Sequence, residues 1–507
     1  MSKDNEINFQ VPFSAYLEDL KTRMKETFRN LSETDRLILR KGVPAVVLRK
    51  IMPMNPLSVS IPAVYGGRGG QVGEIQALLS AAAYESLAFS LTLGINSGLF
   101  LQPVTKYANE QVKKEIFSRF MNDQTMGGLM ITEPDYGTDA LNMQTCFVPE
   151  QATFHITGLK HWAGLTGFAD YWLLAAREQL DSGNLKRDID FFICDVHAPG
   201  QEIMVEELFD NLGLHQIPYG RNRIDIHIPK PFRLEPKTTG IKLLLDLLHR
   251  NRLQFPGMAL GFIHRMMDEA IDHCRSRWVS GSPLLNYDQV QHRLARMQAS
   301  YTITSAMCAY SSHKAGLEQE LSGSGLVANS VKSFATDLMQ EAAQSLVQLV
   351  GAKAYRFSHI GGRGIIDSRP FQIFEGSNDI LYAQVSESVL KRMKKYKEHN
   401  LFQFMRLLRY TEKAACTVKD LLNFELNMEL PQRKMVELGK VISRVISMEM
   451  VMDLGVKGFK KELIDNCLVV LRLEIAGLFG HFKTSDSSIV VEDYQANSTW
   501  LDFISTV

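Results

Sequence analysis

The sequence predicts a mainly helical protein with a β-domain in its middle, because the residue pattern changes twice along the chain. From about residue 13 to residue 123, apolar residues recur at three- and four-residue steps, which is typical of helices. Near Met126 short runs of β-forming residues begin, and beyond Thr239 long helical patterns return. Because no long helix lies between the β-type runs, an antiparallel sandwich or barrel is favoured over βαβ units.

The length and charge of the chain limit its organisation and its partners. A chain of 507 residues exceeds one compact core and predicts about two to four domains. The 56 Lys and Arg residues balance 56 Asp and Glu residues. A protein that wraps nucleic acid or a polybasic membrane-binding protein is therefore disfavoured. Apolar residues make up 45% and charged residues 22%, which is ordinary for globular proteins.

The cysteines indicate neither a metal site nor a redox pair. All six are far apart in sequence and form no CxxC motif or Cys/His cluster. We therefore expect buried, reduced thiols and no bound metal.

Each predicted element follows from a local pattern. In the N-terminal region we expect helices over residues 15–30 and 74–99, with a glycine-rich turn at residues 64–70. The expected strands are residues 152–157, 171–176, 189–196 and 223–228. The expected C-terminal helices are residues 242–278, 289–317, 327–350 and 378–398, and then apolar stripes at residues 435–451 and 463–478. From about Thr484 the tail is polar, and we expect it to be loose.

Two glycine clusters invite a nucleotide-binding interpretation that their context does not support. Residues 323–328 resemble a dinucleotide fingerprint, but helical sequence precedes them, so a helix–helix connection is favoured. The glycines of residues 66–70 lack the Lys-Ser/Thr of a P-loop and predict a turn.

Residues 129–140, which open the β-region, have a composition suited to ligand binding. Thr132 and Thr138 supply two hydroxyls beside a turn of backbone N–H groups, and such a loop can bind the polar edge of a planar ring and an acyl carbonyl. Trp162 follows an expected strand. It could stack on a flat cofactor or pack between sheets, and the sequence leaves both open.

Glu375 is the strongest candidate for a catalytic group. It lies between an apolar run and a Gly-Ser turn that precedes a new helical pattern. A carboxylate there can project into a cleft, where desolvation would raise its pKa and make it a usable base. The alternative is a carboxylate that stabilises the dipole of the next helix.

In combination these motifs resemble the acyl-CoA dehydrogenase family. The segments ITEPDYGTDA and TGLKHW, then Arg252, Arg277, Gln348 and IFEGSNDIL, follow the order and spacing of that family over about residues 10–395. The sequence around Glu375 and the presence of a C-terminal extension are most similar to the very-long-chain branch. The resemblance implies an N-terminal helical domain (1–125), a middle β-domain (126–238), a C-terminal four-helix bundle (239–396) and an extra helical domain (397–507).

The resemblance also implies a reaction. An FAD-dependent enzyme would convert an acyl-CoA thioester to the trans-2-enoyl-CoA, with Glu375 taking the α-proton and FAD the β-hydride. Electrons would pass to an electron-transferring flavoprotein, and the enzyme would be a homodimer or tetramer. A carrier-protein thioester as substrate and a non-catalytic FAD-binding scaffold stay open, whereas a flavin oxidase or monooxygenase is disfavoured by Glu375.

Site residues are implied position by position. Thr132 and Thr138 match hydroxyl residues near the flavin ring, Trp162 matches the aromatic beside it, and Arg252 matches an arginine near the catalytic loop. Arg277 and Gln348 match residues that reach the cofactor of the neighbouring subunit. The implied cofactor-binding set is Leu129, Thr132, Thr138, Trp162, Gly164, Arg277, Gln348, Ser377 and Asp379. The implied substrate-binding set is Thr138, Arg252, Phe374 and Gly376.

Several positions depart from the family pattern and suggest a divergent member. Gly164 stands where threonine is usual, which removes one expected flavin hydrogen bond. The loop 351–354 is poorer in glycine than usual, and His249, Asp288 and Ser280 replace the common residues at their positions.

The extension, residues 402–507, has two interpretations. It packs on the rest of the protein, or it associates with a membrane surface, which needs a basic amphipathic helix. Lys457, Lys460 and Lys461 form only a modest cluster, so packing is favoured. No signal segment and no run of about 18 apolar residues is visible, so we expect a cytoplasmic protein with no membrane-spanning helix.

Overall fold

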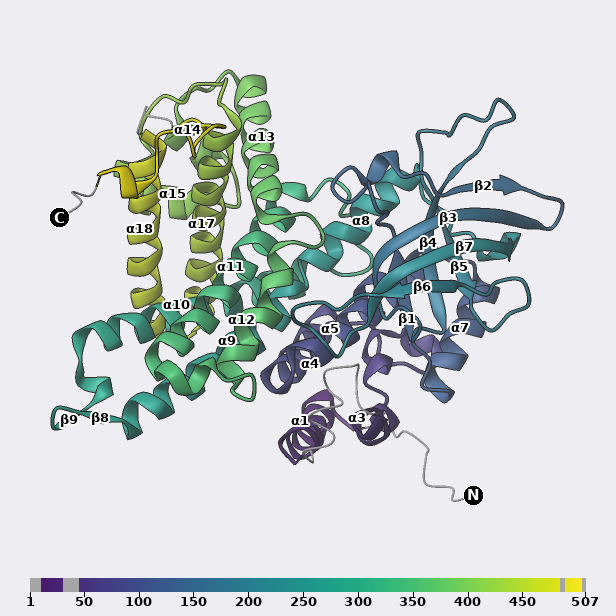
Figure 1. Cartoon of the computed structure of the whole chain (residues 1–507), viewed down its shortest axis with the longest axis horizontal. Coiled ribbons are helices and arrows are strands. Elements are labelled where there is room, and N and C mark those ends of the chain that lie inside the picture. Colours follow the sequence, from purple (N-terminus) through teal and green to yellow (C-terminus); the bar gives the residue numbers. More distant parts are fainter. Residues whose placement is uncertain (1–10, 31–44, 484–487, 504–507) are drawn as a thin grey trace.

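The computed structural model describes residues 11–30, 45–483 and 488–503, and it divides into a helical N-terminal part, a β-domain and a long helical C-terminal part (Figure 1). The predicted fold class is confirmed. The N-terminal helices are α1 (Phe13–Arg29), α3 (Ala45–Ile51), α4 (Val72–Glu85), α5 (Leu87–Gly94), the π-helix η5 (Ile95–Leu101), α6 (Gln102–Tyr107) and α7 (Glu110–Asn122).

The helix expected over residues 74–99 is two helices with a break at Ser86. Ser86 is extended, and its hydroxyl accepts a hydrogen bond from Phe89 N at 3.2 Å, which caps α5. The glycine-rich turn lies where expected. Gly69 adopts φ +112°, a conformation that favours glycine.

The β-domain is one curled sheet of seven strands. These are β1 (Gly127–Met130), β2 (Cys146–Pro149), β3 (Thr153–Gly164), β4 (Tyr171–Glu178), β5 (Asp190–Asp195), β6 (Met204–Leu208) and β7 (Tyr219–Pro229). They pair in the order β1-β4-β2-β3-β7-β6, with β5 on β4. Most pairs are antiparallel as predicted, but β4 runs parallel to both β1 and β2. The sheet is therefore mixed, because the β2–β3 hairpin carries the chain back before β4 begins.

Strands β1, β2 and β6 were absent from the prediction, and each lacks the pattern of a half-buried strand. β1 begins with two glycines, and β2 is four residues long and ends in proline. Every residue of β6 is exposed, so its sequence shows no apolar alternation.

The C-terminal part begins with α8 (Gly240–Arg252) and α9 (Phe255–Ser276), where the sequence predicted one helix. Pro256 explains the break, because a proline ring clashes with the carbonyl four residues earlier, here that of Arg252. The further helices are α10 (Asp288–Lys314), α11 (Gly325–Val350), α12 (Ile360–Ser368) and α13 (Asn378–Tyr396). Gly325 begins α11, so the glycines at 323–325 form a helix–helix connection, as predicted.

The extension packs on the bundle and shares its core. Its helices are α14 (Leu401–Leu407), α15 (Glu412–Thr417), α16 (Lys419–Leu422), α17 (Gln432–Val456) and α18 (Lys461–Lys483). α17 lies along α13, α10 and α11, and Gly439 lets it approach so closely that a Cβ there would overlap Tyr382 O (Figure 1). Buried Arg444 bonds Glu474 of α18 at 2.8 Å. Thr484, where the predicted tail begins, lies outside the described residues.

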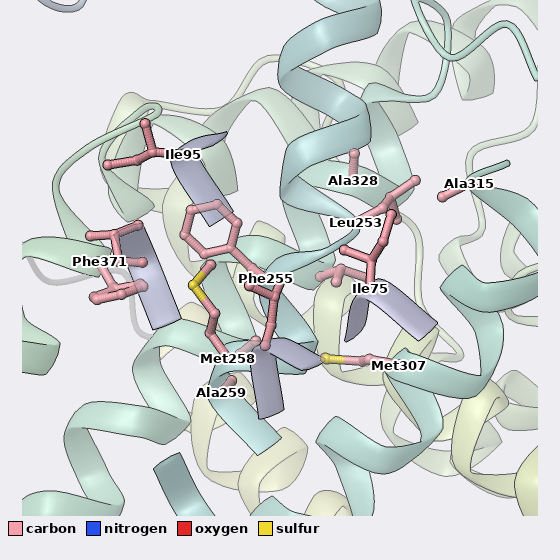
Figure 2. Packing of buried hydrophobic residues seen from close by; sticks show 14 of the residues in the cluster. Ile75, Ile95, Leu253, Phe255, Met258, Ala259, Met307, Ala315, Ala328 and Phe371 are labelled. Carbon is pink, nitrogen blue, oxygen red and sulfur yellow. The ribbon is translucent and has the colours of Figure 1, made fainter. Parts of the chain in front are cut away.

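The buried residues form one core that joins these parts. Figure 2 shows Phe255 of α9 in this core, and its ring packs on those of Phe371 at 5.8 Å and Phe374 at 6.0 Å. The apolar stretch Leu87–Tyr107 meets the length and hydropathy of a membrane span, but 94% of its apolar window is buried by protein, so no span is indicated. All six cysteines are free, but the expectation of burial holds only in part, since Cys416 is exposed and Cys146 and Cys308 are half-buried.

Candidate active site

Glu375 lies in a strained loop between the 3₁₀ turn η10 (Arg369–Gln372) and α13. Its φ is +54°, which is unusual for a residue with a side chain, and Gly376 follows at φ +92°. Two buried cations hold consecutive carbonyls of this loop. Arg252 donates from Nη2 and Nε to Glu375 O at 2.7 and 3.1 Å, and Lys332 Nζ donates to Gly376 O at 2.9 Å. The strain is thus maintained by the last residue of α8 and by a buried residue within α11.

The carboxylate of Glu375 is poised as a base. Asn251 Nδ2 donates a hydrogen bond to Oε1, whereas Oε2 is buried and has no partner among the described residues. Burial raises the pKa of Glu375 to about 7, against the opposing effects of Arg252, Lys332 and Asn251. A carboxylate with this pKa and one unpaired oxygen can accept a proton near neutral pH.

The helix-dipole alternative for Glu375 is wrong. α13 begins after Ser377, and Glu375 bonds Asn251 rather than the N–H groups of that helix. The acidic residue of the first turn is Asp379, which is exposed.

Three residues that support this loop were missed by the sequence analysis: Asn251, Asn329 and Lys332. Asn329 Oδ1 accepts from Arg252 Nη1 at 2.7 Å, and Lys332 Nζ also donates to Asn378 Oδ1 at 3.1 Å. Burial lowers the pKa of Lys332, while the charge of Glu375 opposes that effect. A sequence signal existed, because Asn329 and Lys332 stand three residues apart on α11 and so share one face of a mostly buried helix.

The π-helix η5 connects the loop of Glu375 to the β-domain. A Cβ on Gly98 would overlap Asn251 Oδ1, so this glycine makes room for the side chain that holds Glu375. Two residues earlier, Asn96 Oδ1 accepts from Gly127 N of β1 at 2.7 Å. π-Helical turns often occur at functional sites. This one contacts both Asn251, which bonds Glu375, and the first strand of the β-domain, so it fixes their relative position.

In the β-domain, a buried ion pair shapes the loop that carries Thr132. Lys160 Nζ lies 3.0 Å from Glu133 Oε1 and donates to Ile131 O at 3.0 Å. Glu133 also accepts from Thr145 N at 2.9 Å, and Thr132 O accepts from His161 N at 2.8 Å. These contacts place Thr132 beside the end of β3.

Trp162 lies within β3, not after it as expected. Its φ is +55°, and the pairing of β3 with β7 shifts register between His161 and Ala163. The bulge turns the indole outward, where it is 52% exposed and packs on Phe209 with ring centroids 4.6 Å apart. Packing between sheets, the alternative for Trp162, is therefore wrong.

Gly164 has a structural reason for lacking a side chain. A Cβ there would lie 2.9 Å from Ile95 Cδ1 and 3.3 Å from Tyr219 Cε1. The expected flavin-bonding threonine does not fit beside the π-helix without a shift of Ile95.

The polar side chains predicted to bind a flavin cofactor are free to do so. In the described part of the chain, the side chains of Thr132, Thr138, Trp162, Ser377, Arg277 and Gln348 make no hydrogen bond or ion pair. A set of unpaired hydroxyl, indole, amide and guanidinium donors suits a group rich in carbonyl and phosphate oxygens. Leu129 is half-buried on β1, and Thr132 lies in the loop that follows this strand. These residues therefore fit the predicted cofactor.

The single chain does not bring all of these residues together. Gln348 is 16 residues beyond Lys332 on α11, roughly 24 Å along the helix axis. Arg277 follows the 22-residue α9, beside the hairpin of β8 (Trp278–Val279) and β9 (Ser282–Pro283), which lies at the end of the molecule opposite the β-domain (Figure 1). Both residues therefore lie far along their helices from the segments that contact the loop of Glu375.

The other departures from the family pattern lie away from the carboxylate. His249 Nδ1 bonds Leu321 O at 2.8 Å in the α10–α11 connection, and burial lowers the pKa of His249 to about 4. Ser280 (φ +46°) forms the β8–β9 turn, and Asp288 is the first residue of α10.

Three family models match successive parts of the chain. The N-terminal domain model of acyl-CoA dehydrogenases matches residues 21–124, the middle domain model matches residues 128–225, and the C-terminal domain model matches residues 238–390. Together they cover most of the chain up to the extension.

Individual relatives are distant. An acyl-CoA dehydrogenase of Bacillus subtilis is 24% identical over 68% of this chain and 90% of its own length. The human mitochondrial very long-chain specific acyl-CoA dehydrogenase is 21% identical over 72% of this chain, which spans 56% of that protein. Since the identities are similar, assignment to the very-long-chain branch stays a prediction.

Solved structures share the fold. An acyl-CoA dehydrogenase of Bacillus anthracis complexed with FAD superposes with a TM-score of 0.73 at 17% identity, over 92% of this chain and 88% of that one. A prolyl acyl carrier protein oxidase gives a TM-score of 0.66 at 15% identity, over 74% of this chain and 98% of that one. The first match extends over most of the C-terminal helices described above.

Proposed function

Because the chain belongs to the acyl-CoA dehydrogenase family, we propose that it catalyses the FAD-dependent α,β-dehydrogenation of an acyl-CoA thioester to the trans-2-enoyl-CoA. The observation that carries this proposal is the state of Glu375. Its Oε2 is buried and unpartnered, and its pKa is about 7, which is the state required of a base that removes an α-proton.

The loop around Glu375 also supplies an electrophilic group. An α-C–H is far too weak an acid for a carboxylate unless the thioester carbonyl is stabilised as it gains negative charge. The backbone N–H of Glu375 makes no hydrogen bond to the described residues, and it lies beside the carbonyls that Arg252 and Lys332 hold. This N–H can donate to the thioester oxygen while the side chain faces the α-carbon, so one residue positions both contacts.

The cofactor of this reaction is FAD, which supplies the acceptor for the β-hydride when it is bound. Thr132, Thr138 and Trp162 would hold its ring, and Ser377 would contact it from the start of α13. Arg277 and Gln348, which lie far from Glu375 of their own chain, would serve the site of a second subunit. We therefore propose a homodimer or a dimer of dimers, with an electron-transferring flavoprotein as acceptor. The cytoplasmic location stays a prediction.

Anaerobic titration of the flavoprotein tests the proposal. Acyl-CoAs of graded length should bleach the flavin absorbance of the wild type, and Glu375→Gln should abolish bleaching while it retains FAD. Glu387→Gln, an exposed glutamate on α13, is the matched control and should bleach normally. Absence of bleaching by every acyl-CoA in a protein that holds FAD would contradict the proposal.

The fold likeness to a prolyl acyl carrier protein oxidase supports a second candidate, the same chemistry on a carrier-protein thioester. The same assay separates the two when acyl and aminoacyl carrier proteins are added in place of CoA esters. Bleaching by a carrier-protein thioester alone favours the second candidate. A non-catalytic scaffold is disfavoured, because it has no need for a strained loop with an unpaired buried carboxylate oxygen.

A further inference from the structure

Two histidines lie side by side on the outer face of the β-domain. His155 of β3 and His227 of β7 are directly opposite each other in the antiparallel register. Their rings are parallel, with an interplanar angle of 1° and centroids 4.4 Å apart. Along β7, residues at 225 and 227 are exposed whereas their neighbours are buried, so this face of the sheet is open to solvent.

Two carboxylates flank the histidine pair. Glu150, in the turn between β2 and β3, has Oε1 3.5 Å from His227 Nε2, and Asp225 Oδ1 lies 2.8 Å from His155 Nε2. Thr153 Oγ1 donates to the other oxygen of Glu150 at 2.6 Å, which orients Oε1 toward the rings. Within the described ranges neither carboxylate pairs with a lysine or an arginine.

We propose that Glu150, His155, His227 and Asp225 form a binding site for a divalent transition-metal ion of the Zn²⁺ type. Two imidazole nitrogens and two carboxylate oxygens are ligands that Zn²⁺ binds in four-coordinate sites. The donor atoms of Glu150, His155 and His227 already lie within 4.8 Å of one another. Zinc bonds of roughly 2.0–2.2 Å place ligand atoms about 3.4 Å apart, so the two parallel rings must turn toward each other for both nitrogen lone pairs to meet one ion.

Charge favours a cation between these side chains. Both carboxylates lie at the histidine rings, and within the described ranges neither pairs with a lysine or an arginine, so a divalent ion would offset their charge. The four residues come from two strands and a turn, and the register of the sheet brings them together.

The site is structural rather than part of the proposed reaction. His155 precedes Trp162 by seven residues on β3, roughly 23 Å along the strand. An ion would join the β2–β3 turn to β7 and so brace the outer end of the sheet, which projects away from the helical bundle (Figure 1). Loss of the site is therefore expected to leave flavin reduction unchanged.

Metal titration of the full chain tests the inference. After treatment with a chelator, the protein is titrated with Zn²⁺ by calorimetry, and Co²⁺ is used as a spectroscopic probe. We expect one saturable ion, visible Co²⁺ absorption of a four-coordinate site, and at least about tenfold weaker binding in His155→Ala and His227→Ala. His197→Ala is the matched control, because among the described residues the ring of His197 bonds a single carboxylate, that of Asp170 at 2.8 Å, on the same domain.

Two results would overturn the inference. One is the absence of saturable binding to the wild type, and the other is equal affinity in the wild type and His227→Ala. Both histidine side chains are at least one-third exposed, so the alanine variants should fold, which thermal melting checks. If a variant fails to fold, the Co²⁺ spectrum of the wild type decides, because an exposed carboxylate alone does not give the four-coordinate band.

Discussion

Removal of the Asn251 amide should shift the pH dependence of the reaction upward. Asn251 donates to Glu375 Oε1, and this bond opposes the effect of burial. With both effects present, the pKa of Glu375 is about 7. A hydrogen bond to a charged group contributes about 1.5–3 kcal/mol, so Asn251→Ala should weaken the ionisation of Glu375 by roughly 10- to 100-fold. At pH 7 about half of the wild-type carboxylates are ionised, and in the variant roughly one in ten to one in a hundred.

The assay is the pH profile of flavin reduction, measured anaerobically in single turnovers with a saturating acyl-CoA. At pH 7 the variant should react roughly 5- to 50-fold more slowly, and its rate should recover toward the wild-type value as the pH rises. Asn222→Ala removes a buried amide that bonds Thr166 Oγ1 at 3.0 Å in the β-domain, and it should leave the profile in place. An acidic limb that stays at the wild-type pH, or moves downward, would refute the role of Asn251.

Three further predictions concern the same loop. Glu375→Gln should remove a pH dependence of stability. In the wild type the folded-state pKa of Glu375 is raised from 4.5 to about 7, so the free energy of unfolding falls by up to about 3 kcal/mol as the pH rises through this window. Urea unfolding at pH 5 and pH 8 measures the difference. An unchanged difference between these pH values in the variant would contradict this. Gly98→Ala should reproduce the pH shift of Asn251→Ala, because the new Cβ displaces Asn251, whereas Gly477→Ala, at a position with open space, should not. Lys332→Gln should raise the pKa of Glu375, because it removes a nearby positive charge, and pH profiles of flavin reduction measure this. The same change should lower the free energy of unfolding by about 1–3 kcal/mol, which denaturant titration measures. If neither the pKa nor the free energy of unfolding changed, Lys332 would not support the loop as we infer.

Much of the fold could be predicted because its signals are local. The period of apolar residues placed α1, α10, α11 and α13 within a few residues of their observed bounds. The break after Arg252 was missed, although Pro256 is a local signal against a continuous helix at that point. The strands β1 and β6 could not be predicted, because glycine-rich or fully exposed segments acquire their pairing from neighbours rather than from their own pattern.

The candidate site divides in a similar way. Short sequence motifs that the family shares identified Glu375, Thr132 and Trp162 as candidates. Asn251 was missed, since its partner lies 124 residues away and no local pattern joins the two. The outward turn of Trp162 was missed as well, because a bulge with positive φ is imposed by the pairing of β3 with β7.

The sequence by itself determined the helical–β–helical order, and its motifs predicted Glu375 as the base of the proposed reaction. Only the tertiary structure decided the surroundings of that residue: which oxygen of Glu375 is bonded, which is free, and why Gly98 and Gly164 have no side chain. The physical reason is that helices, turns and motifs arise from neighbours along the chain. A pKa near 7, a strained loop and a pair of stacked histidines depend on burial and charge contributed by distant segments.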